Sequence, residues 1–214
     1  MVQTPGNKSP FYVVQEFVSP LMCEDIIDAC DFNVPDTDKE GDEVKTVKTC
    51  EPAEAMIYER IQRLMPELQA HYNFTYKGTE RMAFEWFPPG SQGQFQSENS
   101  DRLRGKWLRT HNRDFTGILF LTDYQEKVPF EKEYEAYGGK LEFVQHQFGF
   151  QPQRGTLVIF PSDPHFINIT SKVVLGDLYQ VRIQMVAKAP YLYQPQDFPG
   201  NYTTWFKPLL ETTS

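Results

Sequence analysis

Apolar residues recur at helical spacing in two segments of the first 75 residues. After a short strand, a helix is predicted to begin at Ser19, a residue that commonly caps a helix, with Pro20 at its first position. Its inward face is expected to carry four side chains: Leu21, Ile26, Ile27 and Cys30. A second amphipathic helix is predicted within residues 51–74, with apolar side chains three or four residues apart: Ile57, Ile61, Leu64, Met65 and Leu68. The charged segment between them, residues 34–50, is expected to run over the surface and to contain one edge strand.

After residue 80 the pattern changes to short apolar runs separated by turn residues. Each run has the length of a strand, and five of them follow one another: RMAFEWF, FTGILFLTDY, YGGKLEFV, GTLVIFPSD and LYQVRIQMVAKA. Strands at regular spacing after two helices indicate a sandwich or jelly roll flanked by helices. We therefore expect an α+β fold, mainly β, in one domain over residues 1–187, with a helical part at 10–75 and a β core at 80–187.

Residues 188–214 are expected to form an extended C-terminal arm, because the segment from Pro190 is rich in tyrosine, proline and phenylalanine. Aromatic side chains in such a segment offer large apolar surfaces with little regular structure. The arm is expected either to wrap around its own domain or to clasp a partner, and the sequence leaves both interpretations open.

The composition restricts the partners of the protein. A chain of 214 residues with a net charge of −8 is repelled at long range by nucleic acid and by anionic membranes, so neither is expected as the main partner. Three cysteines are an odd number without the close spacing of a metal site, and no signal segment or bilayer-length apolar run is recognised, so a reducing cytosol is expected. One basic cluster is either a local binding patch or a solvated face: Arg102, Arg104, Lys106 and Arg109.

The motifs of the β core occur in a characteristic order. EWFPPG precedes SQGQFQSENS, a Gly138-Gly139 turn precedes a strand, P-x-x-G ends at Gly155 before an apolar strand, and FPS closes that strand at Ser162. In this order the motifs resemble the prolyl-4-hydroxylase-like 2-oxoglutarate/Fe(II) dioxygenases, and in particular the members encoded by tailed phages (cyanophage type), over roughly residues 10–187. The resemblance implies a double-stranded β-helix, a jelly roll of the cupin-like kind.

The same resemblance implies an iron site of two histidines and one carboxylate, together with a basic side chain that anchors 2-oxoglutarate. The H-x-D position of the family falls on Gln96 and Glu98, so that only the carboxylate is kept. The second histidine falls on Asn168, counted back from Gly176, and the anchoring arginine falls on Leu178. Three of the four chemical positions are therefore changed, while the motifs of the scaffold remain.

The changed positions leave other interpretations open. Gln96, Glu98 and Asn168 form either a buried network of hydrogen bonds or an all-oxygen site for calcium or magnesium. His165 lies three residues before Asn168, so a shifted alignment would make it a metal ligand together with Glu98. No other histidine rescues the pattern, because no H-x-D or H-x-E occurs in the sequence.

Arg182 is the remaining candidate to bind a cofactor carboxylate. It shares one face of its predicted strand with Leu178, Gln180 and Gln184, while apolar side chains occupy the other face. Arg182 lies roughly 13 Å from the Leu178 position at about 3.3 Å per residue. The alternative is therefore an arginine that snorkels or pairs with a carboxylate of the protein itself.

These changes predict a catalytically degenerate module without iron or 2-oxoglutarate, reused in a structural or binding role. The phage-type resemblance implies a virion component of the neck, tail or baseplate that assembles in the host cytoplasm with other virion proteins or with copies of itself. The alternative is an active 2-oxoglutarate/Fe(II)-dependent hydroxylase with rearranged ligands, acting on a protein or a nucleotide.

Overall fold

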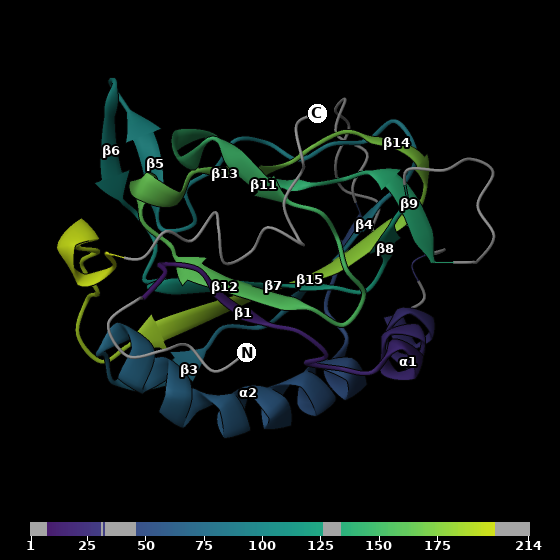
Figure 1. Cartoon of the computed structure of the whole chain (residues 1–214), viewed down its shortest axis with the longest axis horizontal. Coiled ribbons are helices and arrows are strands. Elements are labelled where there is room, and N and C mark those ends of the chain that lie inside the picture. The colour runs from purple at the N-terminus through teal and green to yellow at the C-terminus, as the bar shows by residue number, and fades with distance from the viewer. Residues whose placement is uncertain (1–7, 31, 33–45, 126–133, 200–214) are drawn as a thin grey trace.

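Three layers make up the computed structural model of the chain, which describes residues 8–30, 32, 46–125 and 134–199. Two helices lie along the outer face of a large β-sheet, and three smaller sheets lie over or beside its other face (Figure 1). This arrangement of antiparallel strands with flanking helices confirms the predicted fold class, a mainly β double-stranded β-helix. No helix in the described ranges is long and apolar enough to cross a membrane.

The first helix, α1 (Pro20–Cys30), begins where the sequence predicts, because the Ser19 hydroxyl accepts a hydrogen bond from the Met22 N–H at 3.2 Å. Its buried side chains lie on one face: Cys23, Ile26, Ile27 and Cys30. The prediction that Leu21 faces inward is wrong, since its side chain is 67% exposed. Leu21 is two residues from Cys23, which turns it by about 200° to the opposite side of the helix.

The second helix, α2 (Glu51–Tyr72), confirms the amphipathic pattern. Its buried apolar side chains include Ile57, Ile61, Met65 and Leu68, while Leu64 is only partly buried. The helix ends at Asn73, whose left-handed backbone (φ 53°) lets its N–H bond to the Gln69 carbonyl. The edge strand predicted within residues 34–50 is present at 46–48, and residues 33–45 lie outside the described residues.

The large sheet has the strand order β1-β12-β7-β15-β4-β2, and β3 also pairs with β15. All of its neighbouring strands are antiparallel. The long strand β15 is central, because it pairs with β7 on one side and with β4 and β3 on the other. The strands span β1 (Tyr12–Val14), β2 (Thr46–Lys48), β3 (Tyr76–Thr79), β4 (Ala83–Phe87), β7 (Phe115–Phe120), β12 (Leu157–Pro161) and β15 (Leu178–Ala187).

Smaller sheets form the opposite layer. One has the order β11-β10-β13, and a second has the order β14-β9-β8. Among the described strands, β5 pairs only with β6, as a hairpin. Their strands are β5 (Ser100–Leu103), β6 (Lys106–Arg109), β8 (Asp123–Tyr124), β9 (Glu135–Gly138), β10 (Leu141–Phe143), β11 (Phe148–Phe150), β13 (Asn168–Thr170) and β14 (Val173–Gly176). The described ranges also contain short 3-10 helices, which are η1 (Val144–His146), η2 (Pro164–Phe166) and η3 (Pro195–Asp197).

The two faces of the large sheet bury different side chains. Toward the helices, Val181, Ile183 and Met185 of β15 join the main apolar core with α1 and α2. Toward the second layer, β7 and β12 contribute Ile118, Phe120, Val158 and Phe160 to an aromatic cluster with Phe11, Phe143, Phe150 and Phe166. On this inner face β15 carries Leu178, Gln180, Arg182 and Gln184, all of them buried. The polar side chains of β15 are therefore buried between the large sheet and the layer of smaller sheets, with apolar clusters around them.

The described part of the C-terminal arm packs against its own domain. The Tyr191 N–H donates to Oδ1 of the buried Asp114 at 2.8 Å, and the side chains of Tyr191, Tyr193 and Phe198 contact the main core. Residues 200–214 lie outside the described residues, so the interpretation of the arm as a clasp stays a prediction for them.

Candidate functional site

Backbone pairing brings Gln96 and Asn168 side by side. The two residues form an antiparallel bridge, in which each N–H donates to the carbonyl of the other at 3.0 Å. Residues opposite each other in an antiparallel pair project to the same side, and Glu98, two residues after Gln96, follows on that side. The pairing therefore directs one carboxylate and two amides into the space between the layers.

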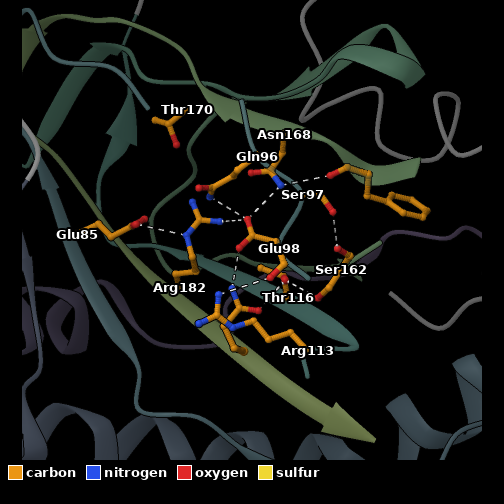
Figure 2. A network of polar contacts seen from close by, with 12 residues as sticks. Glu85, Gln96, Ser97, Glu98, Arg113, Thr116, Ser162, Asn168, Thr170 and Arg182 are labelled. Carbon is orange, nitrogen blue, oxygen red and sulfur yellow. Dashed lines mark hydrogen bonds and ion pairs between the residues drawn. The ribbon is translucent and has the colours of Figure 1, made fainter. Parts of the chain in front are cut away.

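Glu98 is the centre of the site, and both of its carboxylate oxygens accept hydrogen bonds (Figure 2). Oε1 accepts from Gln96 Nε2 at 2.9 Å, from Asn168 Nδ2 at 3.2 Å and from Nη1 of Arg182. Oε2 accepts from Gln184 Nε2 at 2.8 Å. Because Asn168 belongs to β13 and Arg182 and Gln184 belong to β15, the carboxylate connects the two layers of the fold.

Arg182 lies between two buried carboxylates. Its Nε is 3.3 Å from Glu85 Oε1, and its Nη1 bonds to Glu98 Oε1. Burial opposes the charge of Arg182, but the attraction of Glu85 and Glu98 outweighs it, so the pKa of the guanidinium is raised above its ordinary value. Arg182 is therefore a charged side chain that is only 7% exposed, and its guanidinium pairs with two carboxylates of the protein itself.

Glu85 enters the site through the register of the large sheet. It lies directly opposite Gln180 on β15, and Gln180 Nε2 donates to Glu85 Oε2 at 2.7 Å. The same amide lies 3.4 Å from Thr170 Oγ1 on β13. The Gln180 side chain thus makes a second connection between the two layers, in addition to the one through Glu98.

Hydroxyl groups extend the network beyond Gln184. Thr116 Oγ1 donates to Gln184 Oε1 at 2.9 Å and lies 2.7 Å from the Ser162 hydroxyl. Ser97 Oγ donates to the Ser162 carbonyl at 3.2 Å, which joins the chain beside Glu98 to the end of β12. Two buried acceptors of the site, Asn168 Oδ1 and Gln180 Oε1, have no donor among the described residues.

His165 does not take part in this network. It lies in η2, where Asp163 Oδ1 accepts from its backbone N–H and contacts its ring Nδ1 at 2.8 Å. Its side chain is 62% exposed. The pairing with Gln96 places Asn168, and not His165, beside Glu98, and the alternative in which His165 serves as a metal ligand stays a prediction. Among the described residues, no group of three or more histidine, cysteine, aspartate or glutamate side chains is arranged to hold a metal ion.

Leu178 lies apart from the polar side chains. It is fully buried in a small apolar cluster with Phe87, Ala136 and Val173. A side chain of this kind offers no charge to a carboxylate ligand.

The residues at the site do not fit ferrous iron with 2-oxoglutarate. An iron site of the kind implied by the resemblance takes lone pairs from two imidazoles and one carboxylate. Here the groups around Glu98 are N–H donors from three amides and one guanidinium, and together they occupy both oxygens of its carboxylate. If the side-chain amides were rotated by half a turn, their oxygens would face a metal ion beside Glu98. The Arg182 guanidinium would still be bound to Glu98 Oε1.

Sequence reasoning missed Glu85 and did not connect Gln184 to Glu98. The detectable signal for Glu85 was a single carboxylate within the apolar run RMAFEWF, because a charge in a buried strand needs a partner. For Gln184 the signal was its place on the same strand face as Arg182. Neither signal identifies the partner, which depends on how the strands pair.

No protein-family model and no curated protein matches the chain. Solved structures do match. The 2-oxoglutarate complex of the viral collagen prolyl hydroxylase from Paramecium Bursaria Chlorella virus-1 superposes with a TM-score of 0.60 at 17% identity, covering 85% of this chain and 97% of that one. A Pseudomonas putida prolyl-4-hydroxylase gives 0.60 at 14% identity, covering 84% and 94%.

A third similar structure is a Trichoplax adhaerens prolyl hydroxylase in complex with a peptide fragment of the hypoxia inducible factor oxygen degradation domain. Its TM-score is 0.59 at 12% identity, with 83% of each chain covered. At such identities the likeness extends to the fold and not to the activity. The chain therefore has the double-stranded β-helix fold of the prolyl 4-hydroxylase-like oxygenases.

Proposed function

We propose that this protein is a catalytically degenerate form of the 2-oxoglutarate/Fe(II) oxygenase fold that serves as a structural or binding module. One observation carries the proposal: Glu98 gives both of its oxygens to side-chain donors, and one of those donors is the Arg182 cation. In this proposal the buried network takes the place of a metal, because it satisfies the carboxylate and connects the two layers.

Electrostatics supports this reading. A divalent cation about 4 Å from a guanidinium is repelled by about 8 kcal/mol at an effective dielectric constant of about 20, twice the value for two single charges. Such a repulsion corresponds to roughly a millionfold loss of metal affinity. Ferrous iron would bind beside Glu98 only if Arg182 moved away, and that movement would leave the buried Glu85 without its ion pair.

The setting proposed for this module is a tailed-phage particle, in the neck, tail or baseplate, with other virion proteins or copies of the same chain as partners. The support is the order of the β-core motifs, which resembles phage-encoded members of the fold, and a net charge of −8, which suits contacts with proteins better than contacts with nucleic acid. If the proposal holds, the protein is present at a fixed copy number in purified particles of the virus that encodes it. Its absence from such particles would remove this setting.

The loss of iron chemistry is tested by anaerobic titration of the full chain with ferrous iron and 2-oxoglutarate. The expected result is no metal-to-ligand absorption band and no succinate when oxygen is admitted, while an active prolyl hydroxylase gives both under the same conditions. Stoichiometric iron uptake with succinate release would contradict the proposal and would favour the alternative, a hydroxylase with rearranged ligands.

A pair of variants isolates the role of Arg182. The first restores the family residues at Gln96→His, Asn168→His and Leu178→Arg and keeps Arg182; we expect it to bind iron no better than the unchanged chain. The second adds Arg182→Leu with Glu85→Gln, which removes the cation and the charge it balances. Iron binding by the second variant alone is the expected result, and equal binding by both would show that Arg182 does not exclude the metal.

A further inference from the structure

The β5–β6 hairpin projects from one end of the molecule (Figure 1). Its two strands pair only with each other within the described part of the chain. A two-residue turn joins them at Arg104 and Gly105, both with positive φ, 48° and 81°, as in the tight turns that suit a twisted hairpin. The hairpin is therefore a short, defined projection and not an irregular loop.

The end of this hairpin combines exposed apolar and basic side chains. Leu103 and Leu108 are 50% and 49% exposed, and Arg104 and Lys106 are exposed beside them. Leu103 lies opposite Lys106 in the strand register, and Leu108 lies opposite the exposed Asp101 on the same face, so two leucines, one cation and one carboxylate share that face. No ion pair joins Arg104 or Lys106 to any other described residue, whereas Arg109 at the base pairs with Asp114. Within the described part of the chain, the two end cations thus have no carboxylate partner, although the net charge of the chain is −8.

The outer face of α1 has the complementary pattern. Leu21, Asp25 and Asp28 are all exposed, and their spacing of four and three residues places them in one stripe along the helix. The helix has no lysine or arginine in its sequence, and neither aspartate forms an ion pair with a described residue. Asp28 lies in the last turn, where the helix dipole disfavours a negative charge. The stripe of one leucine and two aspartates is therefore an exposed acidic surface without an ion-pair partner among the described residues.

The two surfaces lie at opposite ends of the long axis of the molecule, α1 at one end and the hairpin at the other (Figure 1). One chain cannot bring its own hairpin to its own α1 from these positions. Each surface has exposed leucine. The hairpin also carries three exposed cations, Arg102, Arg104 and Lys106, against one exposed carboxylate, Asp101, while the α1 stripe carries two carboxylates, so the net charges of the two surfaces are opposite. We infer that the β5–β6 hairpin of one copy docks on the outer face of α1 of the next copy, so that the protein assembles head to tail.

A head-to-tail contact is heterologous, since different surfaces of the two copies meet, and it generates a ring when the rotation closes and a filament when it does not. Both apolar patches are small, so each contact is weak by itself and gains strength from closure of the assembly. This inference rests on the proposed structural role, in which copies of the chain are among the partners. A nucleic acid is the other ligand that a basic projection would suit, but it leaves the acidic stripe without a role, whereas a second copy uses both surfaces.

The full chain is tested by sedimentation velocity at increasing protein concentration, in about 0.05 M and about 0.5 M salt, where screening of exposed charges differs strongly. The expected result is association that grows with concentration and weakens at high salt. Reversal of either surface, by Arg104→Glu with Lys106→Glu or by Asp25→Lys with Asp28→Lys, is expected to weaken association about tenfold or more.

Mixing the two reversed variants is the decisive control. The acidic hairpin of one variant then meets the basic helix of the other, and the two unchanged surfaces also match, so association should return to the level of the unchanged chain. A chain that stays monomeric at all concentrations, or a mixture that does not recover, would overturn the inference. Binding of the monomer to DNA, lost on hairpin reversal, would assign the hairpin to nucleic acid instead. None of these results alters the iron titration, which tests the proposed loss of catalysis separately.

Discussion

Replacing Arg182 by methionine should destabilise the protein strongly, because it removes the cation from between two buried carboxylates. Removing one partner of a buried ion pair typically costs about 3–5 kcal/mol. Glu98 keeps three amide donors and Glu85 keeps Gln180, which favours the lower end, about 3 kcal/mol. Since natural domains are stable by roughly 5–15 kcal/mol, this is a large fraction of the total.

The assay is urea unfolding followed by tryptophan fluorescence. With a denaturant slope of about 2 kcal/mol per molar, a loss of about 3 kcal/mol lowers the midpoint by about 1.5 M. The loss in free energy of unfolding should become smaller as the pH falls from about 8 to about 5. A buried carboxylate without a cation has a raised pKa, so the folded variant binds protons more tightly than the unfolded chain does. Further replacement of Glu85 and Glu98 by glutamine should restore much of the loss. A single variant within about 0.5 kcal/mol of the unchanged protein would refute the reasoning.

Three further predictions concern other parts of the fold. Leu178→Arg should lower the free energy of unfolding by about 3 kcal/mol or more, because it buries a charge in an apolar cluster. Leu178→Met should lower it by less than about 1.5 kcal/mol. Comparable urea midpoints for the two variants would contradict this prediction. Burial lowers the pKa of His71 to about 4 in the folded protein. The unfolded chain therefore binds the proton first, and the free energy of unfolding should decline as the pH falls from about 6.5 to about 4. A His71→Gln variant with an equally steep decline would show that another group is responsible. Gly138→Ala should lower the melting temperature, because the backbone has a φ of 94° and a Cβ would lie 2.2 Å from the Lys172 carbonyl oxygen, while Gly78→Ala, with nothing within 4 Å, should have little effect.

Local patterns in the sequence predict the elements of this fold well. The spacing of Ile57, Ile61 and Leu68 defines the buried face of α2, and the apolar runs after residue 80 correspond to strands. The error at Leu21 arose from counting an apolar residue as inward without following its angle around the helix.

The site was less predictable than the elements, since it depends on which strands pair. The two-residue spacing of Gln96 and Glu98 indicates a shared direction, but their contact with Asn168 depends on a bridge between distant segments. The sequence places Arg182 on a polar strand face and leaves its partner open between a cofactor and the protein. The register of β4 and β15 brings Glu85 close enough to pair with it.

The central claim is that Arg182, and not a metal ion, occupies the space beside Glu98. The most direct measurement is a crystal structure of the full chain grown with excess manganese, a redox-stable substitute for ferrous iron, and with 2-oxoglutarate, using anomalous scattering to locate the metal. We predict no anomalous peak within coordination distance of the Glu98 carboxylate and continuous density from the Arg182 guanidinium to that carboxylate. A metal peak bound to Glu98, with Arg182 turned away, would contradict the account.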